Sequence, residues 1–312
     1  MLALIRRRMS ELPLTEQQNP STADLDSLGT ADLLHRINDE DRRVAWAVER
    51  EIDSIAAAVD AIADRLRAGG RLHYFGAGTS GRLGVLDASE LPPTFSTTAD
   101  LVVGHIAGGE RALTAAVEAA EDDERAGADE VIAGNIGAAD AVIGLSASGT
   151  TPYVLGALRA ARVRGALAIA VANSSGSPLC EAAQIAIVPL AGPEVLTGST
   201  RLKAGTAQKL VLNMISTAVM VKLGKVYGNS MVDLQPVNAK LRARATRLVA
   251  QLSGATAHEA QTALVANGWR VKNAIVAHVF GCSPEDAAQR LAADRGSLRM
   301  ALERGAAGST AK

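Results

Sequence analysis

The sequence predicts an α/β fold with a doubly wound parallel sheet, and three observations support this. From Arg71 onward, short apolar runs alternate with segments of helical periodicity, which is typical of strands joined by helices. Before this region the apolar spacing is purely helical, and after Gly228 the strand-like runs stop. We therefore expect an N-terminal helical arm at residues 1–54, an α/β domain at 55–227 and a C-terminal helical domain at 228–312.

The first part combines a polar arm with one long amphipathic helix. Residues from Thr15 to Asp41 are polar and predict an arm with a short helix. Asn38 or Asp39 can cap the start of the long helix, and Gly69-Gly70 can end it in a left-handed turn. Its apolar residues recur at steps of three and four, the spacing of one helix face: Val44, Val48, Ile52, Ile55, Val59, Ile62 and Leu66.

Five apolar runs predict the strands, and the segments between them predict the helices. The strands are expected at Leu72–Phe75, Leu101–Ile106, Ala141–Leu145, Ala166–Ala172 and Ile185–Pro189. The helices are expected at 81–91, 111–125, 152–164 and about 178–183, with a long closing helix from Arg201 to Leu223. Sheets of this class bind ligands beyond the carboxyl ends of their strands, so the loops after the strands are the candidate site.

The last part predicts only short helices. Helical patterns between 238 and 303 are divided at Gly254, Gly268, Gly281–Pro284 and Gly296. The segment Ala257–Val279 resembles a three-helix ubiquitin-associated-like module, although a packing or dimerisation role is favoured over ubiquitin recognition. A basic stripe without interleaved aromatic residues favours a solvated helix face over a nucleic-acid contact; it comprises Lys240, Arg242, Arg244 and Arg247.

Composition excludes several classes of function. The 32 Lys and Arg against 33 Asp and Glu give a formal charge of −1, so a dominant nucleic-acid or anionic-membrane field is not expected. Two cysteines and five scattered histidines lack metal-ligand spacing, so we expect no metal. The longest uncharged stretches are broken by polar residues and glycine, and Leu2–Ile5 precedes Arg6–Arg8, the reverse of signal-peptide order. We expect a cytoplasmic protein, with Met9 as an alternative start.

Two of the loops that follow strands are rich in hydroxyl groups. The first is Gly76-Ala77-Gly78-Thr79-Ser80-Gly81, and the second is Ser146-Ala147-Ser148-Gly149-Thr150-Thr151, followed by Pro152. Each offers Ser or Thr hydroxyls, N–H groups exposed by glycine and a helix N-terminus, which together can hold one phosphate monoester. Each hydroxyl could instead be only a helix cap, but two equivalent loops favour phosphate.

The first loop also fits the GxGxxG pattern of dinucleotide-binding folds. Those folds place an acidic residue at the end of the next strand, where it holds the ribose. Here Asp100 precedes that strand and His105 lies near its end, so we do not expect a nicotinamide cofactor.

Together the two loops resemble those of sugar isomerase (SIS) domains, which hold a sugar phosphate with serine and threonine. The segment Gly192–Lys209 is similar to a signature shared by N-acetylmuramic acid 6-phosphate etherases and the glucokinase regulatory protein. The likeness to the etherases extends to Thr15–Asn19, Ile37–Asp41, Leu86–Thr94, Ile106–Gly109 and Ala116–Asp122. This resemblance implies a flavodoxin-like, three-layer SIS domain. One departure is Thr150, where the family pattern has arginine, so a cation near the phosphate is missing.

The signature segment also predicts part of the phosphate site. Ser199 or Thr200 can cap a helix whose first turn carries Arg201 and Lys203, which makes an anion-attracting end. We therefore add Ser199 and Lys203 to the candidate phosphate ligands, beside the residues of the two loops. The alternative is a capped helix with solvated cations.

The resemblance implies an enzyme that cleaves a lactyl ether at C3 of a 6-phosphorylated sugar, with water finally adding to the sugar. With the ring open, the C1 aldehyde acidifies the C2 proton, a base removes it, lactate leaves from C3, and water adds to the unsaturated aldehyde. Such chemistry requires no metal and no organic cofactor, and one or two carboxylates suffice for its proton transfers.

The resemblance carries Glu90 and Glu121 over as the catalytic carboxylates. From spacing alone Asp87 rivals Glu90, and nothing selects Glu121 within the acidic run 121–124. Pro92-Pro93 should stop the helix just after Glu90, near the first loop, and partial burial would raise the pKa of Glu90. Which carboxylate handles the C2 proton and which handles water stays open.

Two other functions compete with the etherase: a sugar-phosphate-binding regulator and a sugar-phosphate isomerase. A regulator like the glucokinase regulatory protein carries two SIS copies, whereas this chain has room for one. SIS domains commonly pair, and the arm from Thr15 to Asp41 could reach a neighbour, so we expect a homodimer. A small sugar phosphate is the expected ligand, with neither nucleic acid nor membrane as a partner.

Overall fold

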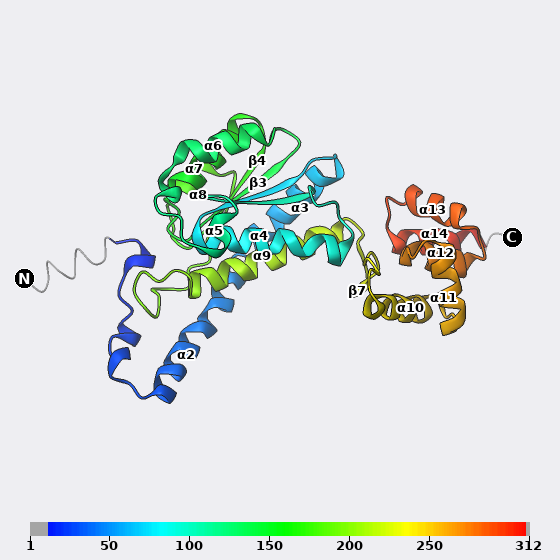
Figure 1. Cartoon of the computed structure of the whole chain (residues 1–312), viewed down its shortest axis with the longest axis horizontal. Helices are drawn as coiled ribbons and strands as arrows, with labels where there is room; N and C mark the ends of the chain where they lie inside the picture. The colour runs from blue at the N-terminus through cyan, green and yellow to red at the C-terminus, as the bar shows by residue number, and fades with distance from the viewer. Residues whose placement is uncertain (1–11, 310–312) are drawn as a thin grey trace, which may run out of the picture. The chain divides into compact units, whose positions relative to one another are not determined.

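The computed structural model describes residues 12–309 and confirms the α/β class (Figure 1). The predictions on Met9 and on Leu2–Ile5 lie outside these residues. Backbone contacts divide the chain into two compact units, Met1–Ser89 with Asp100–Ser216 and Glu90–Ala99 with Thr217–Lys312. The three parts drawn from the sequence have other boundaries and stay a prediction. Within the described residues, no helix has the length and apolar character needed to cross a membrane.

A parallel five-stranded sheet forms the centre of the first unit, in the order β2-β1-β3-β4-β5. All five predicted strands are confirmed, as β1 (Leu72–Gly76), β2 (Val102–Ile106), β3 (Ala141–Ser146), β4 (Leu167–Ala172) and β5 (Ile185–Ile187). Every residue of β1, β3 and β4 is buried, as expected where helices cover both faces. The strand order is that of the flavodoxin-like doubly wound folds.

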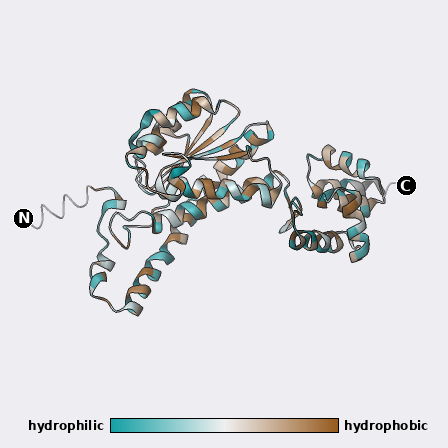
Figure 2. Cartoon of the chain, in the orientation of Figure 1, coloured by the Kyte–Doolittle hydropathy of each residue, from teal (hydrophilic) through white to brown (hydrophobic). Residues whose placement is uncertain are grey.

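Helices lie on both faces of the sheet (Figures 1 and 2). On one face, α7 (Pro152–Val163) and α8 (Pro178–Ala182) pack against the sheet, and α6 (Glu124–Ala133) packs against α7. The other face is covered by α3 (Ile52–Arg67) and by the beginnings of α4 (Gly78–Phe95) and α9 (Lys203–Lys222). Neighbouring residues of β3 show the two faces, because Gly144 lies against Val154 of α7 and Leu145 lies against Gly84 of α4.

The N-terminal arm differs from the prediction. Instead of one helix from Asn38, the chain forms α2 (Thr30–Glu49) and then α3, so that Asn38 and Asp39 lie inside α2. The break falls at Glu51, whose carboxylate accepts a hydrogen bond of 2.9 Å from the backbone N–H of Val188, 137 residues away. The expected left-handed turn at Gly69 is confirmed (φ +89°). Three 3₁₀ turns precede α2, at Leu14–Glu16, Pro20–Thr22 and Leu25–Ser27.

Two helix predictions in the α/β region are also wrong. The helix expected at 111–125 is instead α5 (Arg111–Thr114), a 3₁₀ turn η4 (Ala120–Asp122) and the start of α6. Pro92 and Pro93 do not stop α4 but lie inside it, and the helix continues to Phe95. The chain therefore leaves a loop between Ala115 and Ala119, where the sequence pattern predicts continuous helix.

The second unit contains a hairpin and, within the described residues, five complete helices. The strands β6 (Val226–Tyr227) and β7 (Ser230–Met231) pair antiparallel. The prediction that strands stop after Gly228 is therefore wrong, because β7 follows it. Helices α10 (Ala239–Ser253), α11 (Ala257–Ala266), α12 (Val271–Phe280), α13 (Pro284–Ala293) and α14 (Leu298–Ser309) follow. They are divided at the predicted glycine positions, whereas the ubiquitin-associated-like module stays a prediction.

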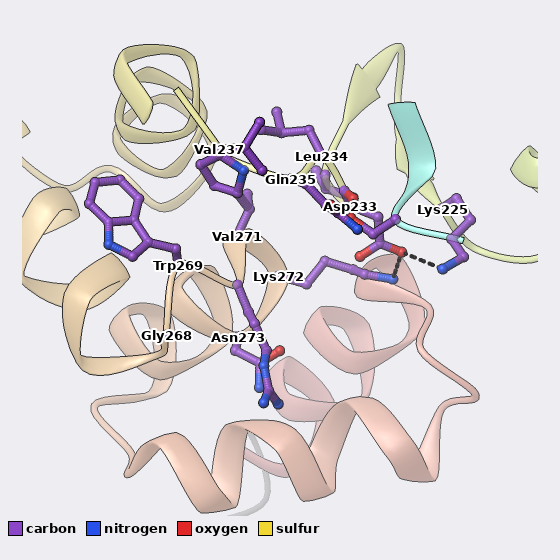
Figure 3. Close-up of a pocket in the computed structure, with 14 residues that line it drawn as sticks. Lys225, Asp233, Leu234, Gln235, Val237, Gly268, Trp269, Val271, Lys272 and Asn273 are labelled. Atoms are coloured by element: carbon purple, nitrogen blue, oxygen red, sulfur yellow. Dashed lines mark hydrogen bonds and ion pairs between the residues drawn. The ribbon is translucent and has the colours of Figure 1, made fainter. Parts of the chain in front are cut away.

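A cavity of about 460 Å³ lies within this second unit (Figure 3). Lys225 and Lys272 point toward Asp233 there, and their ammonium groups lie 3.4 and 2.7 Å from its carboxylate. Lys272 also donates to the carbonyls of Gly224 and Gly296. The two lysines therefore tie the hairpin region to α12, and none of the predicted site residues lines this cavity.

A pair of histidines, of which His73 is buried and His105 half-buried, connects β1 and β2. His73 Nδ1 and His105 Nε2 lie 3.1 Å apart, and His105 Nδ1 lies 3.1 Å from the Glu130 carboxylate. Nε2 of His73 is buried without a hydrogen-bond partner among the described residues. Burial, followed by the charges of His105 and Arg71, lowers the pKa of His73 from 6.5 to about 4.

The His73 site predicts a loss of stability in mild acid. As the pH falls from 6.5 toward 4, the unfolded chain binds a proton that the folded chain does not. The contribution of neutral His73 to stability is fully present above pH 6.5. As it is lost, the free energy of unfolding should decrease by on the order of 3 kcal/mol. Urea unfolding at a series of pH values measures this slope. His73→Gln should flatten it, whereas the same change at exposed His35 should not; equal slopes in wild type and His73→Gln would contradict the assignment.

Candidate functional site

The two hydroxyl-rich loops lie side by side at the reversal point of the sheet. Strands β1 and β3 are parallel neighbours, with Gly76 in register with Leu145. Strand β2 lies on the outer side of β1, so the strand order changes direction between β1 and β3. In open α/β sheets this switch point is where ligands bind. The structure thus confirms that the carboxyl ends of these strands bring both loops to one place.

In the second loop the hydroxyl groups contact one another. Ser146 Oγ accepts from the Gly149 N–H at 3.0 Å and lies 2.8 Å from Thr151 Oγ1. Ser148 Oγ accepts from the Thr150 N–H at 3.2 Å and lies 2.8 Å from Thr150 Oγ1. Thr151 is the N-cap residue of α7, yet its side chain makes no capping hydrogen bond. The cap alternative is therefore wrong for Thr151, and the N-terminus of α7 has no side-chain cap of its own.

The first loop is shaped by contact between its glycines. A Cβ on Gly76 would lie 2.6 Å from the backbone N of Gly81, and a Cβ on Gly81 would lie 2.7 Å from the carbonyl O of Gly76. Only glycine allows the end of β1 to approach the first turn of α4 so closely. Gly78 opens the helix with φ +52°, Thr79 is half-buried and Ser80 is buried. Both hydroxyls thus sit in the first turn of α4.

A third polar loop, which was not among the predicted site loops, follows β4 at residues 173–177. The Asn173 N–H donates to the carbonyl of Ala147 at 3.0 Å, which joins this loop to the second one. The Oγ of Ser174 is buried and has no hydrogen-bond partner among the described residues. The signal was present as the run Asn-Ser-Ser-Gly-Ser directly after the predicted strand Ala166–Ala172.

The contact between the second and third loops predicts a large effect of Gly149→Ala. Gly149 has φ +71°, and a Cβ there would lie 2.1 Å from Ser177 Oγ and 2.4 Å from Ser177 Cβ. The variant should be destabilised by about 1–3 kcal/mol, through backbone strain and displacement of the loop. Thermal unfolding measures this. Gly176→Ala is the matched control, because Gly176 has φ +62° but open space around its Cβ position; equal effects of both variants would contradict the role of the contact.

The signature segment does not cap its helix as predicted. The carboxylate of Glu194, rather than Ser199 or Thr200, accepts from the N–H groups of Lys203 and Ala204, each at 2.9 Å. Burial raises the pKa of Glu194 more strongly than these hydrogen bonds and the Lys203 charge lower it. The anion-attracting end of α9 is thus already occupied by a carboxylate of the chain itself.

Lys203 is placed differently from the prediction as well. Its side chain is fully buried, and its ammonium lies 2.6 Å from the carboxylate of Glu40 and donates to the carbonyl of Ala191 at 2.9 Å. A lysine bound in this way is not free for phosphate. Ser199 is half-buried at the same segment, and Gly205 of α9 lies against Thr79, with 3.3 Å between its Cβ position and Thr79 Cγ2. The start of α9 therefore adjoins the first loop.

The structure places three acids of the run 121–124 in different surroundings. Asp123 caps α6 by accepting from the Ala126 N–H, and the Glu124 carboxylate lies 2.7 Å from Arg159. Glu121 is exposed and lines a pocket of about 230 Å³ together with Gly78 of the first loop and Arg82. Of these three, only Glu121 borders the first loop, which is the choice that spacing could not make.

Glu90 and Asp87 are distinguished by burial. Asp87 is buried and accepts from Tyr74 Oη at 2.9 Å and from Ser216 Oγ at 3.1 Å, and burial raises its pKa. Asp87 is therefore a structural residue. Glu90 is exposed on α4, and its backbone lies about three helical turns, roughly 16 Å along the helix axis, after Thr79. The expected position of Glu90 near the first loop is therefore not found along α4. The partial burial that we expected for Glu90 is thus absent from this structure.

Comparisons with known proteins identify the family. A model of the glucokinase regulatory protein N-terminal SIS domain matches residues 54–162, and an SIS domain model matches residues 116–218. N-acetylmuramic acid 6-phosphate etherases of Cronobacter sakazakii and Salmonella agona are each 54% identical over 290 residues, which cover 93% of this chain and 98% of those proteins. A solved phosphoheptose isomerase of Francisella tularensis is more distant, with 18% identity and a TM-score of 0.47 over 62% of this chain and 98% of that chain. The two etherase matches, which span nearly the whole chain, show that this protein belongs to the N-acetylmuramic acid 6-phosphate etherase family.

Proposed function

We propose that this protein is a carbon–oxygen lyase that converts N-acetylmuramic acid 6-phosphate and water into N-acetylglucosamine 6-phosphate and D-lactate, in the recycling of cell-wall sugar. Its 54% identity to the etherases over 98% of their length carries this proposal. The two hydroxyl-rich loops support it, because they combine hydroxyl groups, glycine N–H groups and two helix N-termini at the switch point of the sheet.

In this proposal the phosphate binds where the two loops meet. Its ligands come from Gly78-Thr79-Ser80-Gly81 at the start of α4 and from Ser146, Ser148, Gly149, Thr150 and Thr151 before α7. Ser199 is proposed as a further ligand, whereas Lys203 is left out because it is bound to Glu40. Thr150 is exposed and uncharged, so this loop supplies hydroxyl and N–H donors but no cation.

Two carboxylates perform the proton transfers in this proposal, and the resemblance assigns them. A base removes the C2 proton of the open-chain aldehyde, the C3–O bond breaks, and the departing lactate oxygen receives a proton. Water then adds to C3 of the unsaturated aldehyde, and a proton returns to C2. Glu90 acts as the acid/base on the departing oxygen, and Glu121 handles either the C2 proton or the incoming water. The position of Glu121 beside Gly78 supports its part.

A product assay separates this function from its competitors. The purified protein is incubated with N-acetylmuramic acid 6-phosphate, with the same sugar lacking phosphate, and with a plain aldose 6-phosphate. We expect D-lactate only from the first. Ketose formed from the third without lactate from the first would favour an isomerase, and sugar-phosphate binding without any turnover would favour a regulator.

We further propose that the protein acts as a cytoplasmic homodimer in which the arm contacts the partner. Two large apolar side chains of α2 are exposed in the single chain, Leu34 at 58% and Trp46 at 60%, and a neighbouring subunit would bury such residues. Light scattering should give twice the 32.2 kDa of the chain. A monomer at the concentration of the assay would contradict this.

A further inference from the structure

The loop that carries Glu121 has little hydrogen bonding of its own. Between α5 and α6, residues 115–123 show three local backbone hydrogen bonds, from Ala115 to Arg111, from Ala120 to Val117 and from Asp122 to Ala119. The second of these is long, at 3.5 Å. Ala119 adopts φ +59°, a conformation that non-glycine residues rarely adopt and that costs on the order of 1 kcal/mol or more. A segment like this keeps one conformation only if the rest of the fold holds it.

Arg82 supplies the main polar contact to this loop. Its Nε donates to the carbonyl of Leu113 at 3.1 Å, and its Nη2 donates to the carbonyl of Ala115 at 3.2 Å. A planar guanidinium can bind two carbonyls at once in a fixed geometry, which an ammonium group does less well. Packing adds a second restraint, because the Cβ position of Gly108 lies 2.9 Å from Val117 Cβ.

Arg82 also lies on α4 directly after the last residue of the first hydroxyl-rich loop, Gly81. It lies four residues after Gly78, so both residues lie on the same side of α4, one turn apart. Gly78, Arg82 and Glu121 line the same pocket of about 230 Å³, whose other walls are mostly alanine side chains. The residue that binds the Leu113 and Ala115 carbonyls is therefore fixed on the helix whose first turn carries Thr79 and Ser80.

We propose that Arg82 is a positioning residue that holds the segment 113–122 against the start of α4, so that Glu121 stays beside the first hydroxyl-rich loop. Its guanidinium acts through the backbone of Leu113 and Ala115. This inference rests on the proposed function for its catalytic consequence, but its structural part does not depend on that function. Charge alone does not explain the arrangement, because both observed hydrogen bonds go to neutral carbonyls.

Hydrogen exchange tests the structural part without any substrate. In Arg82→Ala, amides of the 113–122 segment should exchange at least about tenfold faster than in wild type, because two charge-assisted hydrogen bonds are lost. Exchange of the amides of β4 should not change, because β3 separates β4 from β1, the strand that precedes α4. Arg111→Ala is the matched control, since Arg111 is an exposed arginine two residues before this segment. Unchanged exchange of the segment in Arg82→Ala, or an equal increase in Arg111→Ala, would overturn the proposal.

Kinetics test the catalytic part. Misplacement of a catalytic group by about 1 Å can cost about 10²-fold, so Arg82→Ala should lower kcat by about 10–100-fold with KM within about threefold of wild type. Arg82→Lys should recover only part of the lost kcat, because lysine keeps the positive charge but lacks the planar pair of N–H donors that binds both carbonyls. A raised KM with unchanged kcat, or complete recovery in Arg82→Lys, would show instead that the Arg82 charge binds substrate. A wild-type protein that releases no lactate would sink the proposed function, and the exchange experiment would still decide the role of Arg82.

Discussion

Lys203→Met is expected to lower the free energy of unfolding by about 3–5 kcal/mol, the usual cost of removing one partner from a buried ion pair. Glu40 is only 2% exposed, and the change leaves its carboxylate without the ammonium group at 2.6 Å. Asn19 Nδ2 still donates to Glu40 at 2.9 Å, and Arg43 lies 3.2 Å away, but neither replaces a buried cation. The pair also joins α2 to the first residue of α9, so the contact of the arm with the α/β domain should loosen.

Denaturant unfolding of matched variants measures this effect. Arg43→Met removes the other cation near Glu40, but Arg43 is 55% exposed, so its loss should cost less than about 1 kcal/mol. Burial raises the pKa of Glu40, but the hydrogen bonds from Lys203 and Asn19 and the charges of Lys203 and Arg43 lower it below 4.5 overall. The pair therefore stabilises the fold fully above pH 4.5, and its contribution is lost as the pH falls through the lowered value. Equal losses in Lys203→Met and Arg43→Met would contradict the assignment.

Glu90→Gln is expected to reduce lactate release by about 10²–10⁴-fold, the usual contribution of a placed acid or base. Because Glu90 is exposed and the change is isosteric, the free energy of unfolding should stay within about 0.5 kcal/mol of wild type. Steady-state kinetics with a coupled lactate assay and thermal unfolding together measure both quantities.

Asp87→Asn provides the opposite pattern as a control. Asp87 accepts hydrogen bonds from Tyr74 and Ser216 in the interior, so its amide variant should lose about 1–3 kcal/mol of stability. If Glu90→Gln kept full lactate release, the assignment of Glu90 would be wrong, although membership of the family would stand.

The strands and the two main loops could be predicted because their signals are local. Each strand is a short apolar run, and a hydroxyl-rich loop follows β1 and β3 in the sequence itself. Adjacent parallel strands then bring such loops together without further information. The loop 173–177 had the same kind of signal and could have been found in the same way.

Other features depend on contacts between distant residues and leave no local signal. Glu194, nine residues before Lys203 in the sequence, caps α9 in place of Ser199 or Thr200. Lys203 in turn binds Glu40, which is 163 residues away. Alanine and glutamate favour helix throughout 111–125, so nothing in that pattern shows the break that precedes Glu121. The close packing of α6 on α7 also depends on a distant contact, because a Cβ on Gly127 would lie 1.9 Å from the Tyr153 carbonyl oxygen. This contact fixes the direction of α6 only once the chain is folded.

Isotope incorporation tests the central claim, elimination followed by hydration, most directly. N-acetylmuramic acid 6-phosphate is converted in deuterated, oxygen-18 water, and the two products are analysed by mass spectrometry and NMR. Elimination followed by hydration predicts deuterium at C2 and oxygen-18 at C3 of the sugar phosphate, with no oxygen-18 in the lactate. Heavy oxygen in the lactate hydroxyl would mean that water attacks the lactyl carbon, and that result would contradict the account.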